Sequence, residues 1–311
     1  MKQKIDIVVP VYGSPGSLRP LVESVRAALD ANKYDLEILL VNDRCPRGSG
    51  AVVRELAASF DFVTGVDLVR NFGQHSAIAA GLSLSSGDWV VVMDCDLQDN
   101  PACINDFLKE AELKKCDVVL ARRTERKVGF FKRLQSSLFH KVMNSVVGFR
   151  THSTVGNFGL YSKRVIQSLH LMGDKSRPFP FLVQWLGYPT GFVDVVQEER
   201  FEGKSSYTLS KLVQLALDIA VGFSDRPLKI AVFSGFFVSL GAVVFALFFI
   251  ARYFILAIVP SGWTSLIVTM FMSLGAILFT LGIVGLYVGK NFEQAKNRPT
   301  FLIDEVFKNR V

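Results

Sequence analysis

The sequence contains few of the residues that form disulfides or bind transition metals. Only four cysteines and four histidines occur in 311 residues, and neither type shows the spacing of a zinc site or of a disulfide framework. We therefore interpret the cysteines as reduced thiols. Internal repeats and low-complexity tracts are also missing, and half of the residues are apolar, which excludes the disordered and fibrous classes. The motifs GxGxxG and GxxxxGK[ST] do not occur after the first apolar segment, so the common dinucleotide and phosphate-loop folds are disfavoured.

Charge is missing from two long stretches near the C-terminus. No charged residue lies between Ile230 and Ala251, or between Tyr253 and Gly289. Each stretch supplies the roughly 20 apolar residues that cross a bilayer. We predict a transmembrane hairpin at 229–290, with helices over about 230–252 and 263–289. A pair of buried core helices is the alternative.

Basic residues flank both stretches on the outer sides of this hairpin. They are Arg226, Lys229, Lys290, Lys296 and Arg298. Because basic flanks stay in the cytoplasm, we expect both termini and the domain that precedes the hairpin on the cytoplasmic face of the inner membrane. The apolar run of the first residues, MKQKIDIVVPVYG, is too short for a signal peptide, and we interpret it as a first strand.

The segments around the hairpin show two further patterns. Residues 206–228 carry apolar residues at helical spacing, which predicts an amphipathic helix at the membrane surface. An ordinary core helix is the alternative. In the cytoplasmic tail, 291–311, a short strand pattern over Arg298–Ile303 either returns to the first domain or pairs with a neighbouring subunit. Glycines within both apolar stretches allow close helix packing, so we expect a homo-oligomer.

Strand and helix patterns alternate through residues 1–205. Strands are expected at 5–9, 36–41, 62–69 and 89–93, and helices at 18–31, 50–60 and 76–84. This alternation predicts an α/β domain with a mostly parallel sheet and helices on both faces. In such sheets ligands bind at the carboxyl ends of the strands, and polar residues follow the strands here at 10–14, 42–47 and 94–99.

Three carboxylates lie close together after the strand at 89–93. They belong to Asp94, Asp96 and Asp99. Neighbouring carboxylates repel one another, and a hard divalent cation relieves the repulsion while it binds a substrate's phosphates. The pattern therefore favours a metal–diphosphate site. The alternative is an acidic turn that begins a helix near Pro101.

Six segments together resemble family-2 glycosyltransferases of the GT-A fold, and in particular the polyisoprenyl-phosphate glycosyltransferases, the group with dolichol-phosphate mannose synthase and bactoprenol glucosyltransferase. The segments are VVPVYGSPGSL (8–18), LLVNDRCPRGSG (39–50), LVRNFGQHSAIAAGL (68–82), GDWVVVMDCDLQDNP (87–101), GNFGLYSKRVI (156–166) and RFEGKSSYTLSKL (200–212). The resemblance implies an inverting transferase that moves a sugar from a nucleotide-diphosphate donor, a UDP-sugar, to polyprenyl (undecaprenyl) phosphate in the lipid bilayer.

The resemblance also implies roles for particular residues. The nucleotide and sugar would be bound by Pro10, Val11, Tyr12, Asp43, Asn71, Gly73 and Asp94. The metal, Mg²⁺ or Mn²⁺, would be held by Asp96 and Gln98 against the diphosphate, with Asp99 as a secondary catalytic carboxylate. The diphosphate or the acceptor phosphate would be bound by Arg200, Lys204 and Ser205. Taken singly, each of these residues also has an ordinary structural interpretation, as a strand end, a turn or a solvated face.

A basic segment at 114–150 holds ten lysines or arginines and two acidic residues. We hypothesise that Arg122 or Arg126 lies beside the acceptor phosphate. A basic amphipathic helix resting on the membrane is an equal alternative. Nucleic acid is not an expected partner, because the charge alone suggests it and the apolar stretches favour lipid.

Asn157 departs from the family's pattern, in which an Asp usually stands at that position as a base or as an orienting group. An amide cannot accept a proton as a base does. A lipid phosphate, whose second pKa is near 6, is already a nucleophile at neutral pH, so Asn157 suits a phosphate acceptor. Two other functions stay open: a membrane-anchored nucleotide-sugar-binding scaffold without turnover, and a processive polysaccharide synthase. The second is disfavoured, since the QxxRW motif of such synthases is missing after Gln184.

Overall fold

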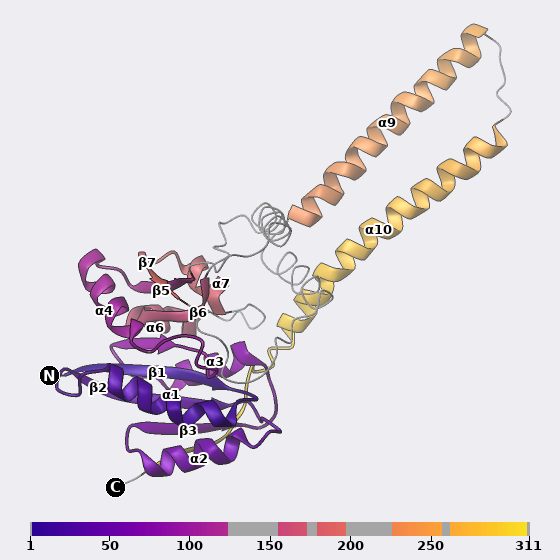
Figure 1. Ribbon diagram of the computed structural model, residues 1–311. Coiled ribbons are helices and arrows are strands. Elements are labelled where there is room, and N and C mark those ends of the chain that lie inside the picture. The colour runs from indigo at the N-terminus through magenta and orange to yellow at the C-terminus, as the bar shows by residue number, and fades with distance from the viewer. Residues whose placement is uncertain (1, 124–154, 173–178, 197–225, 257–261, 310–311) are drawn as a thin grey trace. The chain divides into compact units, whose positions relative to one another are not determined.

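The computed structural model describes residues 2–123, 155–172, 179–196, 226–256 and 262–309 (Figure 1). The chain divides into two compact units. The first takes in the described residues of 1–134, 151–206 and 298–311, and the second those of 207–297. The first unit corresponds to the expected α/β domain together with the C-terminal tail, and the second contains the two apolar stretches.

The first unit is built on an eight-stranded mixed sheet, whose spatial order is β7-β5-β6-β4-β1-β2-β3-β8. The strands are β1 (Gln3–Val11), β2 (Tyr34–Asn42), β3 (Val63–Leu68), β4 (Trp89–Val92), β5 (Val118–Arg123), β6 (Val155–Ser162), β7 (Thr190–Val195) and β8 (Ile303–Lys308). Strands β6 and β8 run antiparallel to their neighbours, and the other described strands run in one direction. The expected, mostly parallel α/β sheet is therefore confirmed.

Helices cover both faces of this sheet (Figure 1). They are α1 (Pro15–Ala28), α2 (Ser49–Ser59), α3 (Gln74–Leu84), α4 (Cys103–Lys114), α6 (Lys163–Leu171) and α7 (Phe179–Leu186). Successive side chains of a strand point to opposite faces, so Ile7 and Val9 of β1 pack in the core beneath α1, α2 and α4. Val8 packs in the opposite core, beneath α3, α6 and α7. Because both faces are buried, the central strands read as continuous apolar runs.

The C-terminal tail forms the last strand of the same sheet. The strand expected over Arg298–Ile303 is wrong in position, because β8 begins at Ile303 and ends at Lys308. Pro299 has no backbone N–H to donate to a strand ladder, and the ladder begins four residues later. Strand β8 pairs antiparallel with β3 of its own chain, which answers the choice between the first domain and a neighbouring subunit.

The second unit contains two long helices, α9 (Arg226–Leu256) and α10 (Trp263–Ala295), which contact each other. Windows of both, Leu228–Phe245 and Thr269–Ala295, have a mean hydropathy of 2.1. At about 1.5 Å rise per residue, 31 and 33 residues exceed the roughly 30 Å apolar core of a bilayer. Large apolar side chains such as Phe236, Phe237 and Phe271 are exposed on them. Both helices are thus long and apolar enough to cross a membrane, and both are longer than expected. Of the amphipathic helix expected at 206–228, residues 206–225 lie outside the described part, and 226–228 begin α9.

Candidate functional site

Several predicted site residues, among them Tyr12, Asp43 and Asp94, lie just beyond β1, β2 and β4, at the carboxyl edge of the sheet. The side chains of Pro10 and Val11 are buried within the sheet, and Val11 is part of the core beneath α1. Val11 therefore contributes its backbone, whose carbonyl accepts the N–H of Asp43 at 3.1 Å. Tyr12, the next residue, exposes 52% of its surface. Of these three side chains, that of Tyr12 is the exposed one.

Asp43 joins the end of β2 to the start of α3. Its carboxylate is 3% exposed and accepts the backbone N–H groups of Phe72 at 2.7 Å and of Gly73 at 2.8 Å. Burial raises the pKa of Asp43 and outweighs the two hydrogen bonds, which lower it. Gly73 has a φ of +92°, a conformation that side chains oppose. Asp43 thus orders the loop that contains Asn71, whose side chain is exposed.

Asp94, directly beyond β4, is held by two amide groups. Its Oδ1 accepts Gln74 Nε2 at 2.7 Å and Asn157 Nδ2 at 3.5 Å. Gln74 is the first residue of α3, and Asn157 lies in β6, which pairs with β4. The fold therefore brings Asp94 and Asn157 together from positions 63 apart in the sequence. Gln74 is a site residue that sequence reasoning missed, although it follows Gly73 inside the segment LVRNFGQHSAIAAGL.

The other acidic residues lie in the loop after Asp94. Asp96 and Gln98 are half-buried, and Asp99 is 4% exposed. Leu97 between them has a φ of +58°, and Asp96 Oδ1 accepts the backbone N–H of Gln98 at 3.3 Å. The described residues form no cluster of three or more Asp, Glu, His or Cys around a metal position. A Mg²⁺-type cation needs only one or two protein carboxylates when substrate phosphates complete its coordination, and this donor set fits such an ion.

A thiol links the first two loops of the site. Cys45 Sγ accepts the backbone N–H of Gly13 at 3.1 Å, and the hydroxyl of Ser49 lies 3.3 Å away. Burial raises the pKa of Cys45, but these hydrogen bonds and that of the Arg47 N–H outweigh burial, so the pKa is lowered. The loop after β1 and the loop after β2 are therefore fixed against each other.

The basic residues assigned to phosphates are only partly described. Arg122, near the carboxyl end of β5, makes two hydrogen bonds with Asp194 of β7, from Nε at 2.5 Å and from a terminal nitrogen at 2.9 Å. This guanidinium lowers the pKa of Asp194, and both side chains are about half exposed. Arg126, Arg200, Lys204 and Ser205 lie outside the described residues.

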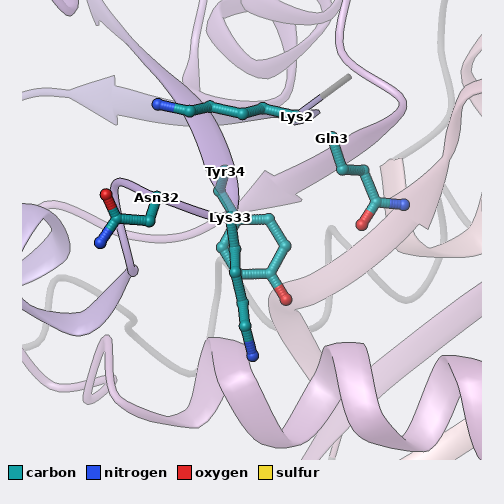
Figure 2. A pocket seen from close by; sticks show the side chains of 5 residues that line it. All are labelled: Lys2, Gln3, Asn32, Lys33 and Tyr34. Carbon is teal, nitrogen blue, oxygen red and sulfur yellow. The ribbon is translucent and has the colours of Figure 1, made fainter.

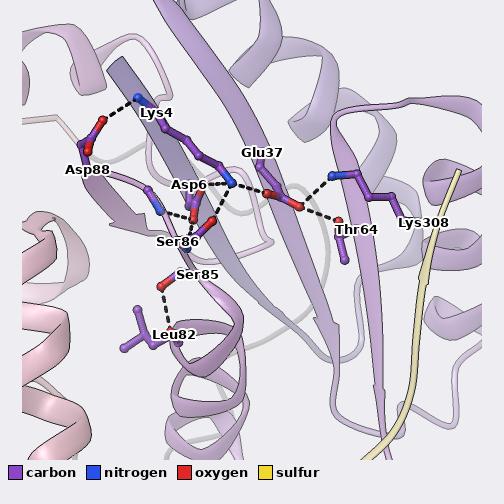
Figure 3. Close-up of polar contacts among 10 residues, drawn as sticks. Lys4, Asp6, Glu37, Thr64, Leu82, Ser85, Ser86, Asp88 and Lys308 are labelled. Carbon is purple, nitrogen blue, oxygen red and sulfur yellow. Dashed lines mark hydrogen bonds and ion pairs between the residues drawn. The ribbon is translucent and has the colours of Figure 1, made fainter. Parts of the chain in front are cut away.

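At the edge of the sheet where β1 and β2 begin, polar side chains connect neighbouring strands. An open hollow there is lined by Lys2, Gln3, Asn32, Lys33 and Tyr34 (Figure 2), none of which is acidic. Close by, Glu37 accepts hydrogen bonds from Lys4, Thr64 and Lys308, so that β1, β2, β3 and β8 are tied together (Figure 3). The chemistry-bearing residues therefore concentrate at the carboxyl edge.

A mixed α/β sheet with an acidic loop at the carboxyl end of its central strands is the architecture of a GT-A glycosyltransferase. The chain belongs to glycosyl transferase family 2, whose model matches residues 6–169. It is 32% identical to the uncharacterized glycosyltransferase YkcC of Bacillus subtilis, over 97% of this chain and 93% of that protein. It is 31% identical to a prophage-derived bactoprenol glucosyl transferase of Shigella flexneri, over 96% and 97%. Mannosyl-3-phosphoglycerate synthase from Rubrobacter xylanophilus shares the fold, with a TM-score of 0.50 and 16% identity over 73% of this chain and 74% of that one.

Proposed function

We propose that this transferase moves one sugar from a UDP-sugar to polyprenyl phosphate at the cytoplasmic surface of the membrane, with inversion at the anomeric carbon. The observation that carries the proposal is the amide of Asn157 beside Asp94, at the carboxyl edge of the sheet, where α/β sheets of this kind bind their ligands. The name of the Shigella flexneri relative, a bactoprenol glucosyl transferase, and the two apolar helices support a lipid acceptor.

The chemistry at Asn157 favours a phosphate over a hydroxyl acceptor. A hydroxyl must lose a proton as it attacks, and a carboxylate or imidazole base assists that step. A phosphate monoester is ionised at neutral pH, so its oxygen attacks without a base. Asn157 then orients Asp94: its amide donates to Oδ1 of Asp94, and the amide of Gln74 donates to the same oxygen. Both amides hold Asp94 in place for the ribose or the sugar.

The residues after β4 are suited to the leaving group. Asp96 and Gln98 would hold a divalent cation, Mg²⁺ or Mn²⁺, and when bound it neutralises the charge of the departing nucleoside diphosphate. Asp99 stays the secondary carboxylate of this loop. At the other end of the donor, the exposed ring of Tyr12 would stack on the base, and Asp43 orders the loop of Asn71 and Gly73 around it.

Phosphate recognition is assigned to Arg122, at the same edge, and to four residues outside the described part of the chain. Arg122 holds its guanidinium in place through Asp194, and a pair at the surface of the protein exchanges partners at little cost. We propose that Arg122 or Arg126 lies beside the acceptor phosphate, and that Arg200, Lys204 and Ser205 bind the diphosphate or the acceptor phosphate. The helices α9 and α10 would keep the polyprenyl chain and the site at the same membrane surface.

The test follows nucleoside diphosphate release by the detergent-purified full chain. UDP- and GDP-sugars are supplied with Mg²⁺ or Mn²⁺, with and without polyprenyl phosphate. We expect release that requires both the lipid phosphate and the metal, for one UDP-sugar. The Asp96→Ala substitution should lower this release by about a hundredfold or more, because the diphosphate charge is then unmet. Asp106→Asn, which changes an exposed acid of α4 that is 57% accessible, is the matched control and should keep full activity.

Two outcomes contradict the proposal. Release that proceeds equally without lipid phosphate would make the protein a hydrolase or assign another acceptor. Donor binding with no release under any lipid condition would favour the scaffold function. Full activity in Asp96→Ala would remove the metal assignment while leaving the transferase intact.

A further inference from the structure

The edge strand β8 carries two adjacent acidic residues at an irregular point of its ladder. Asp67 of β3 pairs with Glu305, and Leu68 pairs with Ile303, so Asp304 has no partner across the ladder and forms a β-bulge. A bulge re-aims the side chains around it. Ile303 accordingly packs with the α3-side core, whereas Glu305, two residues further on, makes an ion pair with α2.

The bulged residue reaches the loop that follows β2. Asp304 Oδ2 lies 3.1 Å from a terminal nitrogen of Arg44. Arg44 directly follows Asp43 and has a φ of +51°, a left-handed conformation that costs energy for any residue with a side chain. The ion pair with Asp304 therefore holds Arg44 in a conformation that the loop does not favour by itself.

The second acid reaches the same loop through a chain of hydrogen bonds. Glu305 lies 2.9 Å from Arg54 of α2, and the same nitrogen of Arg54 lies 2.5 Å from Asp67. Asp67, which is 4% exposed, accepts the amide of Asn42 at 2.8 Å. Asn42 in turn accepts the backbone N–H of Cys45 at 3.1 Å. Both acids of β8 are thus connected to residues 44–45. Asp304 contacts Arg44 directly, and Glu305 is connected to Cys45 through three side chains.

Strand β3 has a glycine, Gly65, where the ring of Phe307 of β8 packs against it. Phe307 lies over Gly65, its partner in the ladder, and a Cβ at Gly65 would lie 2.1 Å from the Phe307 ring. Arg54, which binds Glu305, also lies 4.6 Å from the centre of that ring. Asn309 closes the strand by hydrogen bonds to the carbonyls of Ala57 and Ala58, at the end of α2. A residue without a side chain at position 65 is therefore needed for β8 to lie flat on the edge.

We infer that β8 is a positioning strand of the donor site: Asp304 and Glu305 set the conformation of the loop 43–48 and thereby the affinity for the nucleotide donor. The inference rests on the proposed function, because it assumes that this loop binds the nucleotide. The segment that follows the second apolar helix then contributes to donor binding without touching the donor.

The experiment compares kinetic constants of full-length variants. Asp304→Asn and Glu305→Gln keep the shape of each side chain and remove its charge. We expect each to raise the KM for the donor about threefold, and the double variant about tenfold, since exposed ion pairs contribute modestly. The kcat and the KM for polyprenyl phosphate should not change. Asp106→Asn, an exposed acid paired with Lys109, is the matched control for loss of one surface charge.

Two further variants separate positioning from general loss of stability. The exchange Arg44→Asp with Asp304→Arg restores the ion pair in reverse. It should return the donor KM most of the way from the raised value of Asp304→Asn to that of the wild type. Gly65→Ala should raise the donor KM as well, because it displaces Phe307 and with it the whole strand. The inference is overturned if the double variant has the same donor KM as the wild type. It is also overturned if kcat and donor affinity fall equally in all variants. A wild type without donor turnover would instead count against the proposed function.

Discussion

At the scale of single residues, the chemistry of the site depends on whether position 157, beside Asp94, carries an amide or a carboxylate. Two carboxylates within hydrogen-bond distance repel each other, and one of them takes up a proton. An Asp at position 157 would create such a pair with Asp94. The amide of Asn157 instead donates to Asp94 at 3.5 Å, as Gln74 does at 2.7 Å. At position 157 the protein thus places a hydrogen-bond donor to Asp94 rather than a second carboxylate.

This arrangement predicts a graded effect of substitutions at position 157. Asn157→Ala removes one of the two amides on Asp94 and should lower kcat by about tenfold, a loss of about 1.4 kcal/mol. The loss should be smaller than that in Asp96→Ala, because Gln74 still holds Asp94. The kcat of both variants is measured with polyprenyl phosphate as acceptor under the same conditions. Equal losses in the two variants would show that Asn157 does more than orient its neighbours.

Sequence patterns predicted some of these residues and not their partners. Asp43, Asp94 and Asn157 were each predicted, because polar residues after strands and a matching family motif mark them. Gln74 was not, since its contact with Asp94 depends on the direction in which α3 begins after Gly73. Asn157 and Asp94 meet only because β6 runs antiparallel beside β4, and no local pattern reveals that pairing.

At the scale of elements, one carboxylate joins β1, β2, β3 and β8 near the edge of the sheet opposite the site. Glu37 of β2 accepts Lys4 of β1 at 2.8 Å, Thr64 of β3 at 2.9 Å and Lys308 of β8 at 2.9 Å (Figure 3). Burial alone would raise the pKa of Glu37, but these hydrogen bonds outweigh it and lower the pKa to about 2. Both ends of β8 thus make charged contacts, Lys308 with Glu37 at one end and Asp304 with Arg44 at the other.

The lowered pKa of Glu37 predicts a pH dependence of stability. A carboxyl group with a folded pKa of about 2 and an ordinary value of 4.5 stabilises the fold above pH 4.5, and this contribution is lost as the pH falls toward 2. Glu37→Gln should therefore lower the free energy of unfolding by about 2 kcal/mol at pH 7. The difference between the two proteins should shrink below pH 4.5.

Thermal unfolding from pH 3 to pH 8 measures this difference. Glu55→Gln, which breaks an exposed pair with Arg19, is the control, and its effect should stay below about 1 kcal/mol at every pH. A Glu37→Gln effect that is independent of pH would contradict the account. A thermal unfolding midpoint of Glu37→Gln equal to that of the wild type at pH 7 would also contradict it.

Local patterns located the first strands and helices well and the last strand poorly. Buried parallel strands are continuous apolar runs, and β1 to β4 are found from them within a few residues. Strand β8 reads IDEVFK, a half-polar sequence at an edge, and its partner β3 lies more than 200 residues earlier in the chain. The sheet gives β8 its position through Gly65 and Arg54, and neither residue is marked by any pattern within the tail itself.

At the scale of the whole molecule, the chain combines a family-2 α/β domain with two long apolar helices. Large apolar side chains exposed along helices are costly in water, and a bilayer removes that cost. The helices were predictable, because an apolar stretch of such length without charge is typical of a membrane span. Their ends were not, since α9 begins at Arg226 and includes Lys229, and α10 continues past Lys290 to Ala295.

The central claim is that the acceptor is a phosphate held in the membrane, which attacks without a protein base. The most direct measurement gives the purified full chain its UDP-sugar and metal, and compares polyprenyl phosphate with the polyprenol of the same chain length. Mass spectrometry of the lipid product reads the outcome. The account predicts a glycosylated lipid phosphate, and at least about a hundredfold less product from the alcohol. Equal product from polyprenol would contradict it, because a hydroxyl acceptor needs the base that Asn157 does not provide.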